Sequence, residues 1–221
     1  MIDLNKSLEF FDPSTVKGTV HIIGCGAVGS QVAVLLTRLG ITKFKLWDED
    51  TVASHNIANQ NFNYADIGRL KTEATKEKML AINPECDIAL GGFVTPYNVL
   101  ELQGTIIFAV DSIAVRRQIT GCLATAPINF TLCDFRMGLT SGQCYVLDKS
   151  QVMVYYNTMN FTDEEADART PKSACNFELS VCYSIWALLG AGVAQLVKKW
   201  SGADVPMSMM VDVGDMGIIT F

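Results

Sequence analysis

The segment His21–Leu36, with the sequence HIIGCGAVGSQVAVLL, constrains the fold of this chain more than any other part. The apolar run at residues 19–24 predicts a buried strand, and the apolar residues of 28–39 predict a helix that ends at Gly40. A strand that leads through glycines into a helix is the first unit of many nucleotide-binding α/β folds. We therefore expect this segment to open such a fold.

Three glycines between the predicted strand and helix, at Gly24, Gly26 and Gly29, follow the pattern GxGxxG. Glycines at this spacing let backbone N–H groups approach a phosphate, and the start of the helix adds partial positive charge. Asp48 ends the next predicted strand, 43–47, where a carboxylate can accept hydrogen bonds from the hydroxyls of a ribose. These residues predict a nucleotide site but leave open whether NAD or ATP binds there.

The rest of the chain alternates predicted strands and helices, which predicts an α/β fold. We expect a Rossmann-like, doubly wound, mostly parallel sheet with an antiparallel extension in the C-terminal third. Further strands are expected near 86–90, 105–110, 128–133, 142–147, 152–156, 207–213 and 217–221. The strands at 142–147 and 152–156 are expected to pair as a hairpin. Helices are expected at 71–82, 113–125 and 178–200.

The chain shows no internal repeat and no linker, so we expect one domain over residues 1–221. Its first half, 1–135, is expected to bind the nucleotide. Its second half, 136–221, is expected to bind the substrate and partner.

The composition excludes several classes of protein. Hydrophobic residues make up 49% of the chain and charged residues 18%, which is enough for a substantial core. The net charge of −6 and the lack of a basic block argue against a nucleic-acid partner. The seven cysteines form no CxxC pair and there are only two histidines, so we expect no zinc site. Without a charged-then-apolar leader, these cysteines favour a reducing, cytoplasmic compartment.

The uncharged run Ser180–Val197 approaches the length of a membrane span. Its small and polar residues, and the charges of Lys198 and Lys199 after it, favour a core helix instead. We therefore expect no contact with a membrane.

A second set of motifs begins at the end of the second predicted strand. Its residues, in chain order, are Asp48, Asp50, Asn56, Gln60, Lys71 and Asp111. These linked motifs resemble those of the ThiF/MoeB/HesA superfamily, the bacterial relatives of ubiquitin-activating enzymes. In that superfamily the region has the pattern D-x-D-x-V, then N-x-x-R-Q, then G-x-x-K before a helix. The resemblance covers residues 8–135 well, including VDS at 110–112, and the remainder loosely.

The resemblance implies that a homodimer adenylates the C-terminal carboxylate of a ubiquitin-like protein or peptide, using ATP and Mg²⁺. Lys71 would neutralise phosphate charge, and Asp111 would hold Mg²⁺, a hard cation that prefers carboxylate oxygens. Asn56 and Gln60 would orient phosphate or carboxylate without repelling it. Asp50 would shape the site or assist the metal.

Two positions depart from the superfamily pattern. Asn59 stands where the family has an arginine, and residues 1–37 contain no counterpart of the family's N-terminal arginine. We expect Arg136, in the stretch DFRMG, to supply the positive charge opposite the leaving pyrophosphate, with Arg116 or Arg117 as the alternatives. Together, HNIANQ and DFRMG resemble a compact ThiF-type subgroup of bacteria and phages.

Cys175 lies in the stretch RTPKSACNFELS, just ahead of the long predicted helix. Family members that pass the activated carboxyl on as a thioester carry a nucleophilic cysteine at about this place. The resemblance therefore implies that role for Cys175, and a helix N-terminus lowers the pKa of a thiol. A purely structural cysteine is the alternative.

Three other functions remain open from the sequence. One is an adenylating or dehydratase enzyme that acts on a small molecule or a modified tRNA base. Another is an NAD-dependent oxidoreductase, in which Lys71 and Asp111 would have no role. The third is a nucleotide-binding scaffold without catalysis, for which Asn59 and the missing N-terminal arginine are the argument.

Overall fold

The computed structural model describes residues 2–168, 170–172 and 179–221, and within them eight strands form one mixed sheet. The strand order is β3-β2-β1-β4-β5-β6-β7-β8. The first five strands of the chain run parallel, and the last three add antiparallel pairs. This arrangement confirms the predicted Rossmann-like α/β fold with an antiparallel C-terminal extension.

The elements follow the chain from the parallel strands to the antiparallel ones. The strands are β1 (Thr19–Ile23), β2 (Lys43–Trp47), β3 (Asp87–Gly91), β4 (Gly104–Phe108), β5 (Phe130–Met137), β6 (Ser141–Asp148), β7 (Ser208–Asp212) and β8 (Gly217–Thr220). The helices are α1 (Gly29–Arg38), α2 (Lys71–Ile82), α3 (Ile113–Thr125), α4 (Val152–Asn157), α5 (Asp163–Asp167) and α6 (Cys182–Trp200). Short 3₁₀ helices lie at Pro13–Thr15, Ser54–Asn56, Tyr64–Asp66, Val99–Glu101 and Lys149–Gln151.

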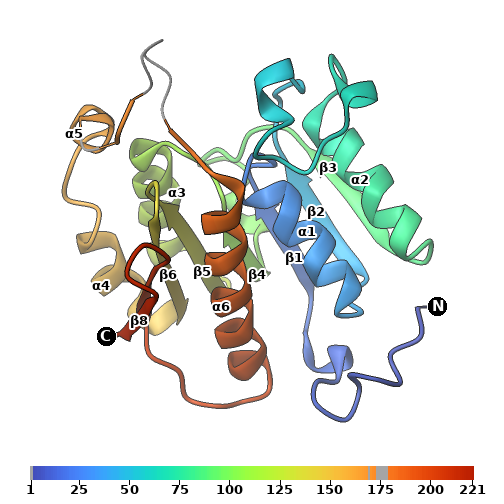
Figure 1. The fold of residues 1–221 in the computed structure, drawn as a ribbon. Coiled ribbons are helices and arrows are strands. Elements are labelled where there is room, and N and C mark those ends of the chain that lie inside the picture. Colours follow the sequence, from blue (N-terminus) through green and yellow to red (C-terminus); the bar gives the residue numbers. More distant parts are fainter. Residues whose placement is uncertain (1, 169, 173–178) are drawn as a thin grey trace.

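Helices cover both faces of the sheet (Figure 1). The core on one face contains Leu36 of α1, Met79 of α2 and Leu189 of α6. The core on the other face contains Leu123 of α3 and Tyr155 of α4. The sheet therefore has an apolar layer on each side, which explains why its central strands are mostly apolar.

The order of the strands reverses between β1 and β4. Strand β1 pairs with β2 on one side and with β4 on the other, and the chain passes through β2 and β3 before it crosses to β4. The loops that follow β1 and β4 therefore lead away in opposite directions at the carboxyl ends of the strands. Sheets of this class bind their ligands at that position.

The predicted strand at 152–156 is wrong, because this segment is helix α4. Its sequence VMVYY is rich in the β-branched and aromatic residues that favour strands. The side chains of Asp148 and Gln151 cap the turn that leads into the helix. Val152 and Tyr155 then lie on one helical face and are buried. Strand β6 pairs instead with β5 and β7, so the antiparallel hairpin is β5–β6.

The uncharged run that begins at Ser180 forms most of α6, a core helix as predicted. The helix begins at Cys182, a few residues later than expected. Its residues Ile185, Leu188 and Leu196 are buried in the core that covers one face of the sheet. In the described part of the chain, no helix is long and apolar enough to cross a membrane.

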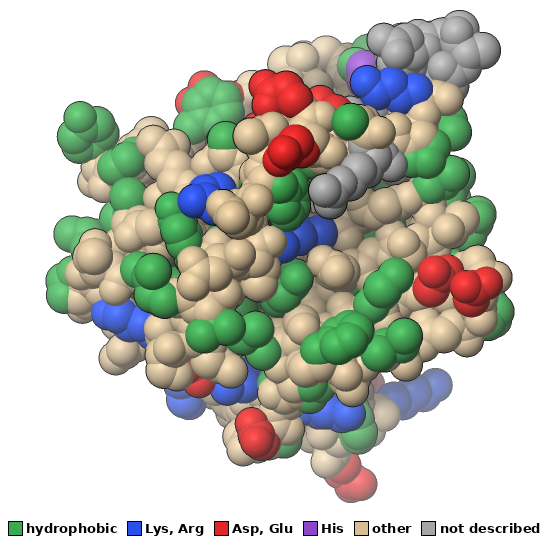
Figure 2. Space-filling view, turned by 90° about the vertical axis from the view of Figure 1, so that its left-hand side faces the viewer, with side chains coloured by type: hydrophobic (Ala, Val, Ile, Leu, Met, Phe, Trp, Pro, Cys, Tyr) green, Lys and Arg blue, Asp and Glu red, His purple; other side chains and the backbone are tan. Residues whose placement is uncertain are grey.

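Strand β8 lies at the outer edge of the sheet and carries exposed apolar side chains. Ile218 and Ile219 are both exposed, and so are Met216 before the strand and Phe221 after it. Figure 2 looks onto the side of the molecule where α4, α5 and β8 lie, and it shows hydrophobic side chains scattered over that face. Since edge strands usually carry charged residues or proline that block pairing, this edge is open to a further strand.

His21 in β1 is a buried polar residue that makes two hydrogen bonds. The indole N–H of Trp47 donates to Nδ1 of His21 (3.3 Å), so Nε2 carries the proton and donates to the carbonyl of Gln103 (3.3 Å). Burial, partly opposed by the bond to Gln103, lowers the pKa of His21 from 6.5 to about 4. The ring is therefore neutral in the folded protein at neutral pH.

Titration of His21 should destabilise the fold in mildly acidic solution. Its pKa in the folded state is the lower one, so the unfolded chain binds more protons and stability is lost as the pH falls from 6.5 to 4. At about 1.4 kcal/mol for each pKa unit, the loss approaches roughly 3 kcal/mol. Urea unfolding should show this loss in the wild type and a smaller one in His21→Gln, which has no titrating ring. Equal pH dependence in the two proteins would contradict the prediction.

Candidate active site

The glycine loop lies at the carboxyl end of β1 and packs against the chain that follows β4. Gly24 has a φ of +90°, and a Cβ there would lie 2.7 Å from the carbonyl oxygen of Ala109. A Cβ at Gly29 would lie 1.8 Å from the carbonyl oxygen of Gly24, so α1 can begin here only with glycine. Apart from Gly26 itself and its two chain neighbours, no described residue has a heavy atom within 4 Å of the Cβ position of Gly26. Gly26 therefore faces open space, which a loop that admits a phosphate requires.

Asp48 and Asp50 connect this loop to the start of α2. One carboxylate oxygen of Asp48 accepts from Cys25 N (2.6 Å) and the other from Asp50 N (2.8 Å). The carboxylate of Asp50 pairs with the ammonium of Lys71 (2.7 Å). The Lys71 side chain is 10% exposed and that of Asp50 is 66% exposed. Because the partner of this lysine is at the surface, an incoming anion can reach the ammonium from the side of Asp50.

The loop that follows β2 is attached to the first turn of α1. Asn61 N donates to the hydroxyl of Ser30 (3.0 Å), and the Gln31 amide donates to the Asn59 carbonyl (3.1 Å). The indole N–H of Trp186 in α6 donates to the oxygen of the same Gln31 amide. These contacts hold the loop beside the glycine loop, and they use the backbone of Asn59 rather than the arginine found there in the family pattern.

The predicted ligand residues Asn56 and Gln60 lie in this attached loop. Oδ1 of Asn56 accepts from Ala53 N (2.8 Å), so its amide caps the short helix at 54–56. Gln60 N donates to the Asn56 carbonyl (2.8 Å), but Oε1 of Gln60 is buried and has no hydrogen-bond partner in the described residues. A buried amide oxygen without a donor costs free energy, so Gln60 fits a site that a ligand completes.

Asp111 follows β4 and is exposed, and its Oδ1 accepts from Ser112 N (2.9 Å). The carboxylate of Asp163, from α5, holds the adjacent start of α3: it accepts from the Ser112 hydroxyl (2.8 Å), Ile113 N (2.5 Å) and Ala114 N (3.3 Å). Burial opposes ionisation, but these hydrogen bonds hold the pKa of the Asp163 carboxyl below its ordinary value. Both aspartates line an open cavity of about 310 Å³.

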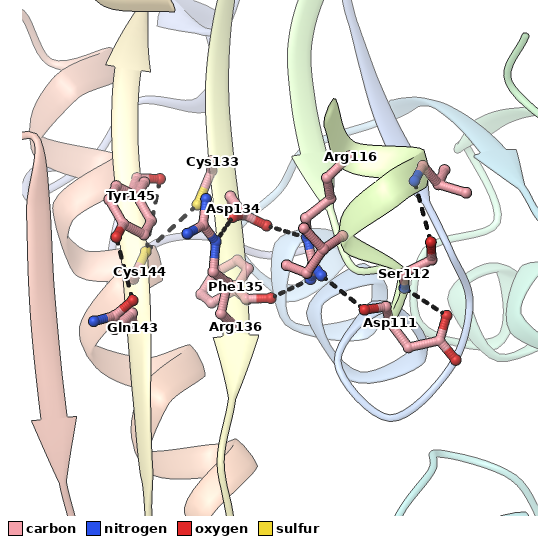
Figure 3. Close-up of polar contacts among 12 residues, drawn as sticks. Asp111, Ser112, Arg116, Cys133, Asp134, Phe135, Arg136, Gln143, Cys144 and Tyr145 are labelled. Carbon is pink, nitrogen blue, oxygen red and sulfur yellow. Dashed lines mark hydrogen bonds and ion pairs between the residues drawn. The ribbon is translucent and has the colours of Figure 1, made fainter. Parts of the chain in front are cut away.

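The guanidinium of Arg136 lies in a buried network (Figure 3). It donates to one oxygen of Asp134 (2.6 Å) and to the hydroxyl of Thr158 (3.1 Å), and it lies 4.4 Å from the ring centroid of Tyr145. Burial disfavours the charged form, but Asp134 and Tyr155 together outweigh it and raise the pKa of Arg136 above its ordinary value. These contacts occupy the guanidinium of Arg136, which the sequence predicted to lie opposite the leaving pyrophosphate.

The two alternative arginines are engaged as well. Arg116 donates to the other oxygen of Asp134 (2.9 Å) and to two backbone carbonyls. Arg117 donates to the carbonyl of Met159 (2.5 Å) and lies 4.5 Å from the ring centroid of Tyr156. All three arginines therefore hold other parts of this chain, and Lys71 is the predicted cation that is linked to the glycine loop.

Cys175 lies outside the described residues, so its predicted thioester role stays a prediction. Cys25 lies inside the glycine loop and is fully buried. Burial, together with the nearby carboxylate of Asp48, raises the pKa of the Cys25 thiol far above its ordinary value. The Cys25 thiol is therefore uncharged and does not serve as a nucleophile.

The residues of the site fit a nucleoside triphosphate with magnesium. Gly26 leaves space for phosphate, Lys71 supplies positive charge, Gln60 lacks a donor, and Asp111 offers an exposed carboxylate. Among the residues that the structure describes, no group of three or more His, Cys, Asp and Glu side chains is placed to hold a metal. Mg²⁺ commonly binds through one or two carboxylates together with phosphates and waters, so Asp111 suits that ion.

Comparison with known proteins decides the family. The model of the ThiF family matches residues 15–209, which is most of the chain. The chain belongs to the ThiF family. The match runs well beyond residue 135, so the family relationship also includes α6 and part of the antiparallel extension, which the sequence motifs covered only loosely.

Two curated relatives of this ThiF-family chain differ in their names. It is 37% identical over 114 residues to the tRNA threonylcarbamoyladenosine dehydratase of Escherichia coli K12, covering 49% of this chain and 41% of that protein. It is 38% identical over 86 residues to the ubiquitin-like modifier-activating enzyme 5 of Arabidopsis thaliana, covering 39% of this chain and 19% of that one. The chain thus spans less than half the length of these relatives.

Solved structures show the same fold over nearly the whole ThiF-family chain. Escherichia coli MccB, solved with ATP, matches with a TM-score of 0.72 at 16% identity, over 95% of this chain and 65% of that one. Selenomethionine PaaA matches with a TM-score of 0.68 at 20% identity, over the same shares. At these identities the likeness shows the fold alone.

Two residues of the site region were missed by sequence reasoning. Asp134 lies in the stretch DFRMG, two residues before Arg136, and the available signal was a carboxylate directly after a predicted apolar strand. Asp163 gave no signal, because it reaches the start of α3 from a distant segment that looked only polar.

Substitution at Gly29 and Gly26 should distinguish a glycine that packing requires from one that packing does not require. Gly29→Ala places a methyl group against a backbone carbonyl, so we expect a loss of at least about 3 kcal/mol of unfolding free energy. Gly26→Ala meets open space and should change stability by less than about 1 kcal/mol. Urea unfolding followed by tryptophan fluorescence measures both. Equal midpoints for the two variants would rule out the packing difference.

The two acidic partners Asp134 and Asp50 should differ greatly in their effect on stability. Asp134→Asn leaves Arg116 and Arg136 buried without a counter-charge, and we expect a loss of about 3–5 kcal/mol. Asp50→Asn removes an exposed partner of Lys71 and should cost less than about 1 kcal/mol. Thermal and urea unfolding check the ranking, which similar losses in the two variants would overturn.

Proposed function

We propose that this chain uses ATP to adenylate the C-terminal carboxylate of a peptide or a small, ubiquitin-like protein. The observation that supports the proposal most is the placement of Lys71 and Asp111. The buried lysine is linked to the glycine loop from the β2 side, and the exposed carboxylate follows β4. Phosphoryl chemistry needs such charge placement around a loop that binds phosphate.

In the proposed reaction an oxygen of the acceptor carboxylate attacks the α-phosphorus of ATP. The bond between the α-phosphorus and the bridging oxygen breaks, and pyrophosphate leaves with the electron pair. The backbone N–H groups around Gly26 and the start of α1 would bind phosphate oxygens, and Lys71 would offset their charge. Mg²⁺ held by Asp111 would neutralise further phosphate charge. Asn56 and Gln60 would orient the reacting groups without repelling them.

A carboxylate-bearing protein or peptide is the acceptor that we favour. The resemblance to ubiquitin-like modifier-activating enzyme 5 supports it, and so does the acidic balance of the chain, with a net charge of −6. A modified tRNA base is the second candidate, because the Escherichia coli relative is named a tRNA threonylcarbamoyladenosine dehydratase. The assembly that we propose, from the family resemblance, is a homodimer in the cytoplasm.

A thioester step is proposed for Cys175. Its thiolate would attack the carbonyl carbon of the acyl adenylate, so that a carbon–sulfur bond forms, the bond from that carbon to the oxygen that bridges to phosphorus breaks, and AMP leaves with its electron pair. Adenylation does not depend on this step. A Cys175→Ala variant would therefore keep the first reaction and lose the second.

ATP–pyrophosphate exchange tests the proposed adenylation. We expect exchange with Mg²⁺ and a peptide or small protein that ends in a glycine carboxylate, and none with the same molecule as its C-terminal amide. Asp111→Asn and Lys71→Met should each lower the exchange rate roughly 10²–10³-fold, because each removes charge stabilisation from the reacting phosphates.

The controls distinguish binding from catalysis. Equilibrium dialysis with ATP should still show binding to Asp111→Asn, since the glycine loop is intact in that variant. Exchange with a modified-tRNA substrate, and none with any carboxyl-terminal peptide or protein, would favour the second candidate. ATP binding without any exchange would leave a scaffold and refute adenylation.

A further inference from the structure

Arg116 reaches three acceptors from one buried position (Figure 3). Its Nε donates to Oδ1 of Asp134 (2.9 Å), and its Nη2 donates to the carbonyl of Phe135 (2.9 Å). Its Nη1 donates to the carbonyl of Asp111 (3.1 Å). A guanidinium presents its donors in a rigid planar fork, so three acceptors around it fix both its position and its orientation.

The anchor of Arg116 is Asp134, in the buried strand β5. The second oxygen of that carboxylate accepts from Arg136 (2.6 Å), which also donates to Thr158 (3.1 Å). One buried carboxylate thus lies between two guanidinium groups, and each of them would lose a buried, charge-assisted hydrogen bond if it moved away. Strand β5 therefore fixes the position of the Arg116 guanidinium, and the remaining donor of that guanidinium can fix the position of another part of the chain.

What Arg116 holds is the backbone of Asp111. This residue lies in the short turn between β4 and α3, and its carboxylate is exposed. Figure 3 shows the backbone carbonyl of Asp111 turned toward Arg116 and its carboxylate turned away. The contact thus sets the position of the main chain from which the carboxylate extends, without using the carboxylate itself.

We infer that Arg116 is a positioning residue that keeps the carboxylate of Asp111 in place for the metal–nucleotide complex. The inference rests on the proposed function, in which Asp111 holds Mg²⁺. Asp134 already gives Arg116 an opposite charge, so the bond from Arg116 to the Asp111 carbonyl is not needed to form an ion pair. A lysine at the same position would have three donors on a single nitrogen, so it would lack the planar fork that reaches three separate acceptors.

The experiment measures metal binding and nucleotide binding separately. Mn²⁺ replaces Mg²⁺, and because ATP binds Mn²⁺ by itself, electron paramagnetic resonance compares the signal of Mn²⁺–ATP on the protein with that of Mn²⁺–ATP alone. ATP binding without metal is measured by calorimetry in EDTA. For Arg116→Gln we expect the Kd for Mn²⁺ to rise about tenfold, the size of effect that outer-shell partners of metal ligands have. The Kd for ATP in EDTA should stay within about twofold, because the glycine loop and Lys71 are unchanged.

Two further variants complete the test. Arg117→Gln alters the next residue of α3, whose guanidinium bonds the carbonyl of Met159 and not that of Asp111, so it should bind Mn²⁺ as the wild type does. Arg116→Gln leaves Asp134 and Arg136 as a balanced pair, which favours folding. If it nevertheless unfolds, Arg116→Lys keeps the charge, loses the fork, and carries the same expectation.

The outcomes separate this inference from the proposed function. Arg116 variants that bind Mn²⁺ as tightly as the wild type, or that lose Mn²⁺ and ATP affinity equally, would show a purely structural role and overturn the inference. In either case wild-type ATP–pyrophosphate exchange would still support adenylation. Wild-type protein that binds no Mn²⁺ with ATP would overturn the metal role of Asp111 and this inference with it.

Discussion

The close packing of the glycine loop against the end of β4 is the constraint on which the rest of the structure depends. A Cβ at Gly24 would meet the carbonyl of Ala109, and one at Gly29 would meet the carbonyl of Gly24. This approach brings the start of α1 next to the turn that carries Asp111. On the other side, Asp48 accepts a backbone N–H of the loop. The loop is thus ordered by β4 and β2 before any ligand binds, which lowers the entropy lost on binding.

The cations of the site region differ in how deeply their acidic partners are buried. Lys71 is buried, but its partner Asp50 is at the surface and can be exchanged for an anion at little cost. Arg116 and Arg136 share Asp134, which is fully buried, so neither guanidinium can move away without losing a buried, charge-assisted hydrogen bond. Positive charge therefore serves two purposes here: one group is available to a ligand, and two groups maintain the framework behind it.

The parallel half of the fold was predictable because its signals are local. The segments 43–47 and 71–82 agree residue for residue with β2 and α2, since the short strand KFKLW and a helix that ends before Asn83-Pro84 show in short windows. The helix at 152–156 was not predictable, because its residues favour a strand. It is a helix because its apolar side chains are buried in the core on the α3 side of the sheet. The direction of the Arg136 side chain could not be predicted for a similar reason. Its guanidinium is placed by Asp134, two residues earlier in β5, and by Thr158, which lies in a distant segment of the chain.

The cap that Asp163 places on α3 also affects the order in which the molecule is completed during synthesis. Asp163 follows Ile113 by 50 residues, so the first turn of α3 gains this partner only after β5 and β6 have been translated. A nascent chain that ends before α5 already contains every parallel strand and the contact of Arg116 with the turn, but the turn still lacks the three hydrogen bonds to Asp163. On the ribosome, the parallel part of the sheet can therefore form before the site reaches its final order.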